Sequence, residues 1–262
     1  MRNLDGVRGR WSRRDFLQAS AVTVAAAAGI GCDDPSGSSE YDGDARLTSQ
    51  VGAPTTSLAP GTHPLGLDAL RAGRVFIPSG YQHATPTTLV VLLHGANGSG
   101  RAITTPFAPL ADAAGTVVLA PDSRYRTWDL LLRDFGPDVS FIDEALAWTF
   151  ERVNVDPARL TIAGFSDGAS YSLALGLSNG TLFKRVIAFS PGFLFVRTTQ
   201  GKPPVFITHG EDDPVLPISI TSRTIVPALE GAGYTVDYHE FEGGHLVDQS
   251  LAEAALAWAA TP

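Results

Sequence analysis

Cysteine is nearly absent from this sequence, which contains a single one, Cys32, among 262 residues. One cysteine excludes an intrachain disulfide and any zinc site built from several cysteines. Lysine and arginine form no cluster beyond the first 32 residues, and the formal charge of the chain is −8. Those 32 residues hold five arginines and two aspartates, a net +3, so the remainder carries −11. Because phosphate binding requires a basic surface, we expect no nucleic-acid partner.

A long hydrophobic run is also missing. The mostly apolar, uncharged stretch 16–30 has 15 residues, whereas a membrane-spanning helix needs roughly 20. Arg13 and Arg14 precede it, and a basic segment followed by a short apolar one is typical of a secretory signal. The paired arginines followed by Phe16 and Leu17 resemble a twin-arginine signal, which exports folded proteins. Residues 1–32 are therefore predicted to direct export from a bacterial cytoplasm to the periplasm, the cell surface or the medium.

The end of this signal can be read in two ways. Small residues at 26–28 suit an ordinary signal peptidase. Alternatively, the segment 29–32 resembles a lipoprotein signal, in which Cys32 would be lipidated, although Gly29 stands where leucine is usual. Such a lipid anchor is the only membrane contact we expect. The following segment is rich in aspartate, serine and glycine, so residues 33–65 are predicted to form a flexible tether.

Residues 66–262 have the pattern of one folded α/β domain. Hydrophobic residues make up 44% of the chain and charged residues 18%, which favours a globular body over disorder. Short apolar runs alternate with longer helical patterns, which predicts a mostly parallel sheet covered by helices on both faces. No large insertion separates these elements, so we expect no lid domain. The pattern predicts strands at 74–77, 89–93, 116–120, 160–164, 185–189, 205–208 and 235–241, and helices at 101–114, 141–153, 168–177, 217–229 and 247–260.

The sequence GFSDGAS, residues 164–170, provides a candidate nucleophile. Ser166 lies between Gly164 and Gly168, after a predicted strand and before a predicted helix. A nucleophile at a tight strand-to-helix turn needs small residues two positions before and after it, because the backbone passes close to itself there. Gly-x-Ser-x-Gly is a weak signal by itself, and the flanking strand and helix make it specific.

A serine hydroxyl also needs a base to remove its proton. Among six histidines, His245 follows the last predicted strand and precedes the closing helix, so it can reach the carboxyl edge of the sheet. His239 lies within that last strand, where a packed structural histidine is expected. His94 and His209 each follow a strand, and we expect His94 to be structural in its loop.

The third member of a catalytic triad is a carboxylate that orients the imidazole. Asp167 is adjacent to Ser166, but three further carboxylates stand in a row at 211–213 after a strand. The order serine, aspartate, histidine is met by Ser166, Asp213 and His245. Asp167 is then expected to contribute its backbone N–H to an oxyanion hole, while its carboxylate caps the following helix.

Four segments carry a resemblance to a known family: LLHGANG, GFSDGAS, HGEDDPVLP and GGH, in this order. They resemble the serine carboxylesterase branch of the α/β-hydrolase superfamily, near the phospholipase/carboxylesterase (acyl-protein-thioesterase-like) and polyester-depolymerase-like esterases. The resemblance covers about residues 70–260 and implies an α/β-hydrolase fold. It also implies Asp213 rather than Asp212 as the triad acid, and the Ala96 N–H as the second oxyanion donor.

The resulting hypothesis is a secreted or lipid-anchored serine esterase that works through an acyl-enzyme without a metal or cofactor. The substrate is expected to be a small-molecule or polymeric ester, with Trp128 and Phe193 as weak candidates for the pocket wall. Alternatives are a polyester or polyhydroxyalkanoate depolymerase and a feruloyl-type esterase, then a lysophospholipase, a thioesterase or a serine peptidase. A non-enzymatic alternative is a binding protein on a hydrolase scaffold. We expect a monomer or a homodimer.

Overall fold

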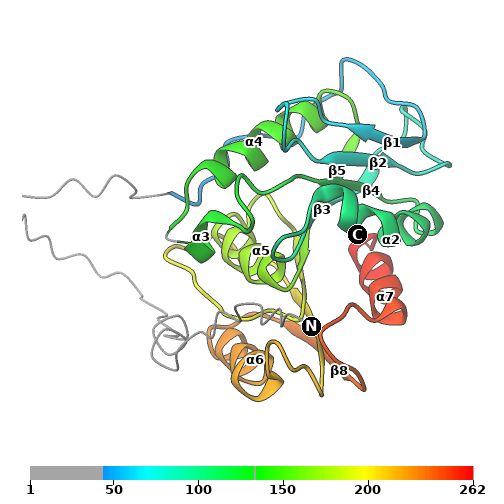
Figure 1. The fold of residues 1–262 in the computed structure, drawn as a ribbon. Coiled ribbons are helices and arrows are strands. Elements are labelled where there is room, and N and C mark those ends of the chain that lie inside the picture. The colour runs from blue at the N-terminus through cyan, green and yellow to red at the C-terminus, as the bar shows by residue number, and fades with distance from the viewer. Residues whose placement is uncertain (1–43, 133, 262) are drawn as a thin grey trace, which may run out of the picture.

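The computed structural model describes residues 44–132 and 134–261, which form a sheet between two helical layers (Figure 1). The eight strands are arranged in the order β1-β2-β4-β3-β5-β6-β7-β8. β1 and β2 pair antiparallel at one edge, β2 joins β4 antiparallel, and every other pairing is parallel. The strands are β1 (Gly61–Pro64), β2 (Arg74–Ile77), β3 (Thr87–Leu93), β4 (Val117–Ala120), β5 (Val155–Phe165), β6 (Arg185–Phe189), β7 (Val205–Gly210) and β8 (Val236–Phe241).

The helices cover both faces of this sheet, as the alternation of strand side chains requires. In β3, Leu89 and Val91 belong to one apolar core, whereas Val90 and Leu92 belong to the other. Successive side chains of a strand point to opposite faces, so a continuous apolar run is buried on both sides. The first core includes α4 (Pro137–Phe150), α5 (Asp167–Ser178) and α6 (Ser222–Gly231), and the second includes α2 (Gly100–Ala113) and α7 (Gln249–Ala259).

The predicted fold class is confirmed, but several element boundaries differ. The helix predicted at 141–153 begins at Pro137, which suits a first helical position because its missing N–H has no partner there. The helix predicted at 217–229 is interrupted: a short 3₁₀ turn, η1 (Ile218–Ile220), precedes α6. Strand β1 and the short helix α3 (Asp129–Leu132) were not predicted.

Residues 44–65 of the segment predicted as a flexible tether pack against the domain and include β1. From Asp44 onward the chain packs on the domain, with Ala45 and Leu47 buried. The Asn179 side chain accepts from Leu47 N (2.9 Å) and donates to Ala45 O (2.8 Å). Its amide therefore makes the two hydrogen bonds that a neighbouring strand would make to these backbone groups. We call residues 44–51 the N-terminal strap. Residues 1–43, which include the predicted signal and Cys32, lie outside the described part.

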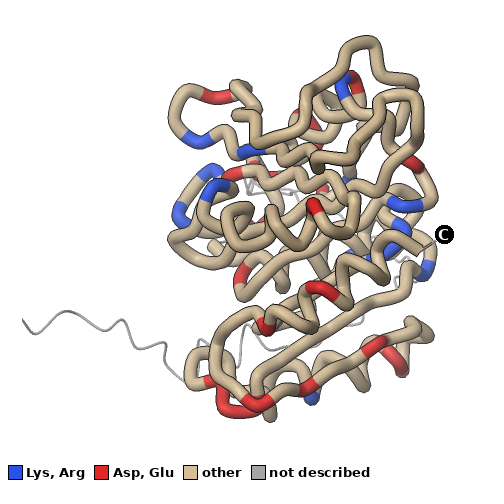
Figure 2. Tube along the Cα trace, turned by 90° about the vertical axis from the view of Figure 1, so that its right-hand side faces the viewer, with Lys and Arg blue, Asp and Glu red and all other residues tan. Residues whose placement is uncertain are grey.

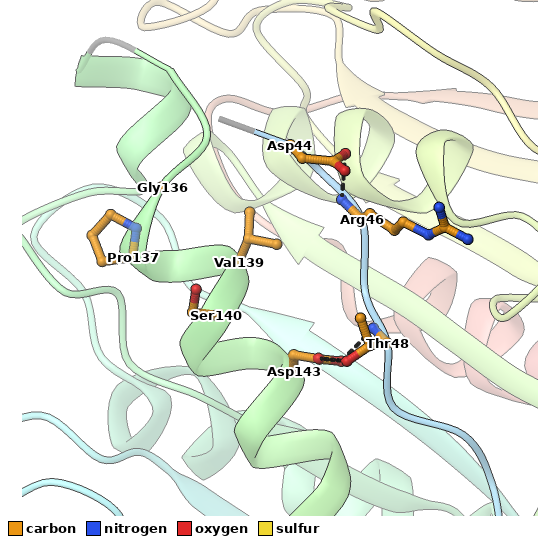
Figure 3. Close-up of a pocket in the computed structure, with 8 residues that line it drawn as sticks. All are labelled: Asp44, Arg46, Thr48, Gly136, Pro137, Val139, Ser140 and Asp143. Carbon is orange, nitrogen blue, oxygen red and sulfur yellow. Dashed lines mark hydrogen bonds between the residues drawn. The ribbon is translucent and has the colours of Figure 1, made fainter. Parts of the chain in front are cut away.

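The strap also binds α4 through one carboxylate. Asp143 accepts hydrogen bonds from Thr48 N and Ser49 N and from the Thr48 hydroxyl, at 3.0, 2.8 and 2.6 Å. Burial raises the pKa of Asp143, but these bonds outweigh it and hold that pKa below its usual value. A shallow pocket between strap and helix is shown in Figure 3, lined by Asp44, Arg46, Thr48, Gly136, Pro137, Val139, Ser140 and Asp143.

Negative charge is concentrated near the C-terminus. Residues 205–262 contain nine acidic side chains and one basic one, Arg223, and acidic positions follow one another along the lower part of Figure 2. Arg223 itself pairs with Glu240 across α6 and β8. Within the described ranges, no helix combines the length and apolarity required to cross a bilayer.

Candidate active site

Ser166 sits at the sharp turn between β5 and α5, in a conformation that L-residues rarely adopt (φ 56°, ψ −119°). The two flanking glycines make this turn sterically feasible. A Cβ on Gly164 would lie 2.2 Å from Gly168 O, and a Cβ on Gly168 would lie 2.3 Å from Leu93 O. The turn therefore has the geometry that the Gly-x-Ser-x-Gly pattern predicts, a strained strand-to-helix corner that presents one serine.

Three side chains from distant parts of the sequence meet at this turn. The Ser166 hydroxyl lies 2.8 Å from His245 Nε2, and His245 Nδ1 lies 2.6 Å from Asp213 Oδ2. Ser166 and Asp213 follow the C-terminal ends of β5 and β7, and His245 follows β8. Because β5, β6, β7 and β8 lie in this order and all run parallel, their C-terminal ends share one edge of the sheet. The structure thus brings together the three residues that the sequence predicted as a triad.

The carboxylate of Asp213 is held at both oxygens. Oδ1 accepts from Val215 N and Leu216 N, each at 2.8 Å, and Oδ2 faces His245 and, at 3.2 Å, His209 Nε2. Burial raises the pKa of Asp213, but the hydrogen bonds from Leu216 N, His245 and Val215 N outweigh it, so its pKa lies below the usual value. Asp213 therefore stays ionised beside His245.

The sequence predicted no specific role for His209, which lies 3.2 Å from Asp213 of the triad. Its Nε2–H donates to Leu216 O (2.8 Å), and its Nδ1 accepts from the Ser222 hydroxyl (2.6 Å). Burial lowers its pKa, so the ring is neutral. His239, predicted to be a packed structural residue, is 39% exposed at its side chain, stacks on Phe206 and contacts Asp237 at 2.9 Å.

The two predicted oxyanion donors lie on either side of the nucleophile. Asp167 N is the first N–H of α5, and a Cβ on Gly95, next to Ala96, would lie 3.3 Å from Ser166 Cβ. Within the described part of the chain, neither Asp167 N nor Ala96 N has a hydrogen-bond partner. Asn97 completes the Ala96 loop with a positive φ of 57°. Among the described residues, the two N–H groups that the sequence predicted as oxyanion donors are thus without a partner near Ser166.

His94 anchors the loop that carries Ala96. It is buried, its Nδ1–H donates to Gly95 O (2.7 Å), and its Nε2 accepts from Ser123 N (3.0 Å). Burial lowers its pKa, which keeps the ring neutral and able to make both bonds. The structural role expected for His94 agrees with these contacts.

Among the described residues, Asp167 makes no hydrogen bond to His245. Its carboxylate belongs to the first turn of α5, where a negative charge was expected, and its Oδ2 accepts from the Thr127 hydroxyl at 2.6 Å. Burial raises the pKa of Asp167, and the Thr127 hydrogen bond and the charge of His245 offset this only in part. The carboxylate is thus held by a side chain from a distant loop rather than by a backbone N–H of the helix.

The predicted wall residue Trp128 is buried completely and is not a pocket wall. Its ring packs between His94 and Tyr171, with centroids 4.9 and 5.2 Å away, and its Nε1–H donates to His94 O (2.8 Å). Phe193 is half-buried in the loop after β6, and its N–H lies 3.3 Å from the Ser170 hydroxyl. Phe193 remains a candidate for the pocket wall.

Asp129 and Asp138 form a buried pair of carboxyl groups that supports the loop before α4. The sequence did not predict this pair. Asp138 Oδ1 and Oδ2 accept from Arg124 N (2.6 Å) and Asp129 N (2.7 Å), and Asp129 in turn accepts from Asp138 N and Tyr171 OH. Burial, reinforced by the neighbouring charge of Asp129, raises the pKa of Asp138 to about 7. Burial likewise raises the pKa of Asp129.

This raised pKa predicts a pH-dependent stability. The folded protein holds the Asp138 proton more tightly than the unfolded chain, so the stabilisation is largest at acidic pH and is lost as the pH rises through about 7. Relative to Asp138→Asn, the wild type should lose roughly 2–3 kcal/mol of unfolding free energy between pH 5 and 8. Urea unfolding at several pH values measures this difference.

Asp156→Asn is the matched control. The pKa of Asp156 is lowered by its hydrogen bond to Ala158 N and by Arg159, so this carboxylate is already ionised throughout that range. The unfolding free energy of Asp156→Asn should therefore differ from that of the wild type by the same amount at every pH between 5 and 8. If the difference between Asp138→Asn and the wild type is also constant over this range, Asp138 does not titrate there.

The comparisons with known proteins agree with this geometry. The chain has the α/β-hydrolase fold, as its sheet order, its strand–nucleophile–helix corner and its likeness to a solved esterase show. Residues 139–258 match the Phospholipase/Carboxylesterase family. This confirms the predicted resemblance. Among the described residues, no group of three histidine, cysteine or acidic side chains is placed to hold a metal ion.

Individual relatives are similar over parts of the chain. A probable acetylxylan esterase A of Aspergillus fumigatus is 31% identical over 104 residues, which cover 36% of this chain and 28% of that protein. The chain thus matches less than a third of that relative's length. The crystal structure of esterase PE8 is 26% identical with a TM-score of 0.57, over 72% of this chain and 97% of that one. A ferulic acid esterase from Anaeromyces mucronatus, 19% identical with a TM-score of 0.56, covers 72% of this chain and 83% of that chain and supports the fold.

Proposed function

We propose that this protein is a serine hydrolase that cleaves carboxylic esters through an acyl-enzyme. The observation that carries the proposal is the hydrogen-bonded series from Ser166 through His245 to Asp213, at 2.8 and 2.6 Å. Beside it, the N–H groups of Ala96 and Asp167 have no partner among the described residues. A binding protein would not need this series, because binding alone requires neither an activated nucleophile nor an oriented base.

In the first half of the reaction, His245 Nε2 takes the Ser166 proton as Ser166 Oγ bonds to the ester carbonyl carbon. The carbonyl oxygen becomes negative and accepts hydrogen bonds from Ala96 N and Asp167 N. Asp213, ionised and bonded to His245 Nδ1–H, stabilises the imidazolium. The tetrahedral intermediate then breaks its bond to the alcohol oxygen, which leaves with the proton from His245.

In the second half, water attacks the acyl carbon of the acyl-Ser166 ester. His245 accepts a proton from this water, and the same two N–H groups bind the second oxyanion. When the bond to Ser166 breaks, His245 returns the proton to Ser166 Oγ and the carboxylic acid is released. No step requires a metal ion or a redox cofactor.

Esters of a carbohydrate polymer are the substrate class we propose, with small acyl groups preferred. The acetylxylan esterase relatives support this choice, since their name describes an acetyl ester of the polysaccharide xylan. The nine acidic side chains of residues 205–262, three of them at 211–213, disfavour anionic esters near the triad. Polyester cleavage is the alternative that the same open site would serve.

We also propose that the protein is exported. The basic segment with Arg13 and Arg14 and the short apolar run after it support a leader that ends near Cys32. Export would place the enzyme where polymeric substrates are found.

Covalent labelling tests the proposed chemistry. The wild type should release p-nitrophenol from the acetate and butyrate esters, and a fluorophosphonate should abolish this activity at one equivalent. Mass spectrometry should find the adduct on the peptide that contains Ser166. A panel of acetylated xylan, methyl ferulate and an aliphatic polyester then ranks the substrate classes. An unlabelled Ser166 in a protein that still hydrolyses the esters would refute the assignment of the nucleophile.

A further inference from the structure

Three consecutive residues, Arg126, Thr127 and Trp128, each bind a different part of the two loops that carry the oxyanion donors. We propose that this tripeptide is a brace that sets the positions of the two donors, and that Thr127 is a positioning residue for catalysis. The inference rests on the proposed function, because it assigns a role within the same site.

The first and third contacts hold the loop of Ala96. Arg126 O accepts from Asn97 N at 2.6 Å, and Trp128 Nε1–H donates to His94 O at 2.8 Å. His94 and Asn97 flank the segment Gly95–Ala96 on both sides. The donor N–H of Ala96 therefore lies between two points that are both fixed to the brace.

The second contact holds the other donor. The Thr127 hydroxyl donates to Asp167 Oδ2 at 2.6 Å, and Asp167 carries the second donor N–H on its own backbone. The bond also keeps the carboxylate turned toward the brace. A carboxylate free to turn toward the oxyanion would oppose the developing negative charge, so a fixed orientation favours the transition state.

The brace is itself rigid. Asp138 accepts from Arg124 N, two residues before the brace, and from Asp129 N, the residue directly after it. Trp128 is completely buried between two aromatic rings. Because the brace is hydrogen-bonded near both ends and buried at Trp128, it can fix the distance between the Ala96 and Asp167 N–H groups. An isolated surface loop could not fix this distance.

The decisive variants are made at Thr127 and Trp128. Thr127→Val deletes the hydroxyl and keeps the shape of the side chain, Thr127→Ser restores the hydroxyl, and Trp128→Phe replaces the indole, with its N–H, by a smaller aromatic ring. Thr149→Val is the control for the loss of a threonine hydroxyl: Thr149 is more buried than the half-buried Thr127, and its hydroxyl bonds Ala145 O within α4. Kinetics with p-nitrophenyl acetate and inhibition by an aliphatic trifluoromethyl ketone are measured for all four.

Because acylation and deacylation both pass through an oxyanion, a misplaced donor should lower kcat and leave KM nearly unchanged. We expect Thr127→Val to lose about ten- to a hundredfold in kcat, part of the 10²–10³ that deletion of a whole donor costs. Thr127→Ser should recover most of the rate. The trifluoromethyl ketone, whose Ser166 adduct carries an oxyanion, should bind more weakly by a similar factor.

A purely structural Thr127 would behave differently. If Thr127→Val and Trp128→Phe both match Thr149→Val in kcat and in ketone affinity, and differ only in melting temperature, the brace is refuted while the esterase proposal stands. If the wild type hydrolyses none of the esters and Ser166 is not labelled, both are refuted. If Thr127→Val does not fold, Thr127→Ala, which also lacks the hydroxyl, takes its place beside Trp128→Phe.

Discussion

Asp213→Asn is expected to lower kcat by about four orders of magnitude while leaving the fold intact. The reason lies in the two backbone donors, Val215 N and Leu216 N, that both bind Oδ1. They require the amide oxygen of asparagine at Oδ1, so its NH₂ group must face His245 Nδ1. His245 must then carry its proton on Nε2, where it can no longer accept the proton of Ser166.

The matched control is Asp167→Asn, the same substitution at the other carboxylate near Ser166. An amide at this position keeps the backbone N–H for the oxyanion and an oxygen acceptor for Thr127. Most of the wild-type rate should therefore remain. Steady-state kinetics of the two variants with p-nitrophenyl acetate measure this contrast, and the opposite ranking would mean that Asp167 is the triad acid.

Ser166→Ala is expected to lower kcat by about 10⁵–10⁶, because His245 and the oxyanion donors remain but no acyl-enzyme can form. Fluorophosphonate labelling should disappear with the activity. Melting temperature should change little, since alanine removes one hydroxyl at a position whose main-chain conformation is set by the adjoining glycines.

Ser178→Ala serves as the control at the other end of the same helix. Ser178 is also buried, and its hydroxyl bonds Ala174 O within α5. This variant should keep wild-type rates and full labelling. Comparable activity in Ser166→Ala and Ser178→Ala would place the nucleophile elsewhere in the chain.

Local patterns predicted the scaffold and the triad for a common physical reason. Buried parallel strands are continuous apolar runs, and Gly164 and Gly168 follow from close backbone packing, so both are visible without knowledge of distant contacts. In a parallel sheet, residues that follow strand ends share an edge. That rule placed the carboxylates at 211–213 and His245 near Ser166, and the family resemblance then selected Asp213 among the three carboxylates.

The features that were mispredicted depend on partners far away in the sequence. Trp128 follows a strand end as a pocket residue would, but its place is decided by packing on His94 and Tyr171. The buried carboxyl of Asp138 was not predicted, because the groups that bind it, Arg124 N and Asp129 N, belong to a separate segment earlier in the chain. The polar composition of 44–51 indicated a tether. The segment packs on the domain because the Asn179 side chain, at the end of α5, bonds Leu47 N and Ala45 O, and this partner is not visible in the local sequence.

The N-terminal strap has a consequence for the order of folding. Its bonds from Leu47 and Ala45 to Asn179 join residues 132 and 134 positions apart. Contacts across such separations require closure of a long loop and can form only after α5 has been synthesised and packed. The strap is thus expected to be among the last segments to dock, although it leaves the ribosome before the rest of the described domain. For a transport route that accepts only folded chains, docking of the strap would mark the point at which folding of the domain is complete.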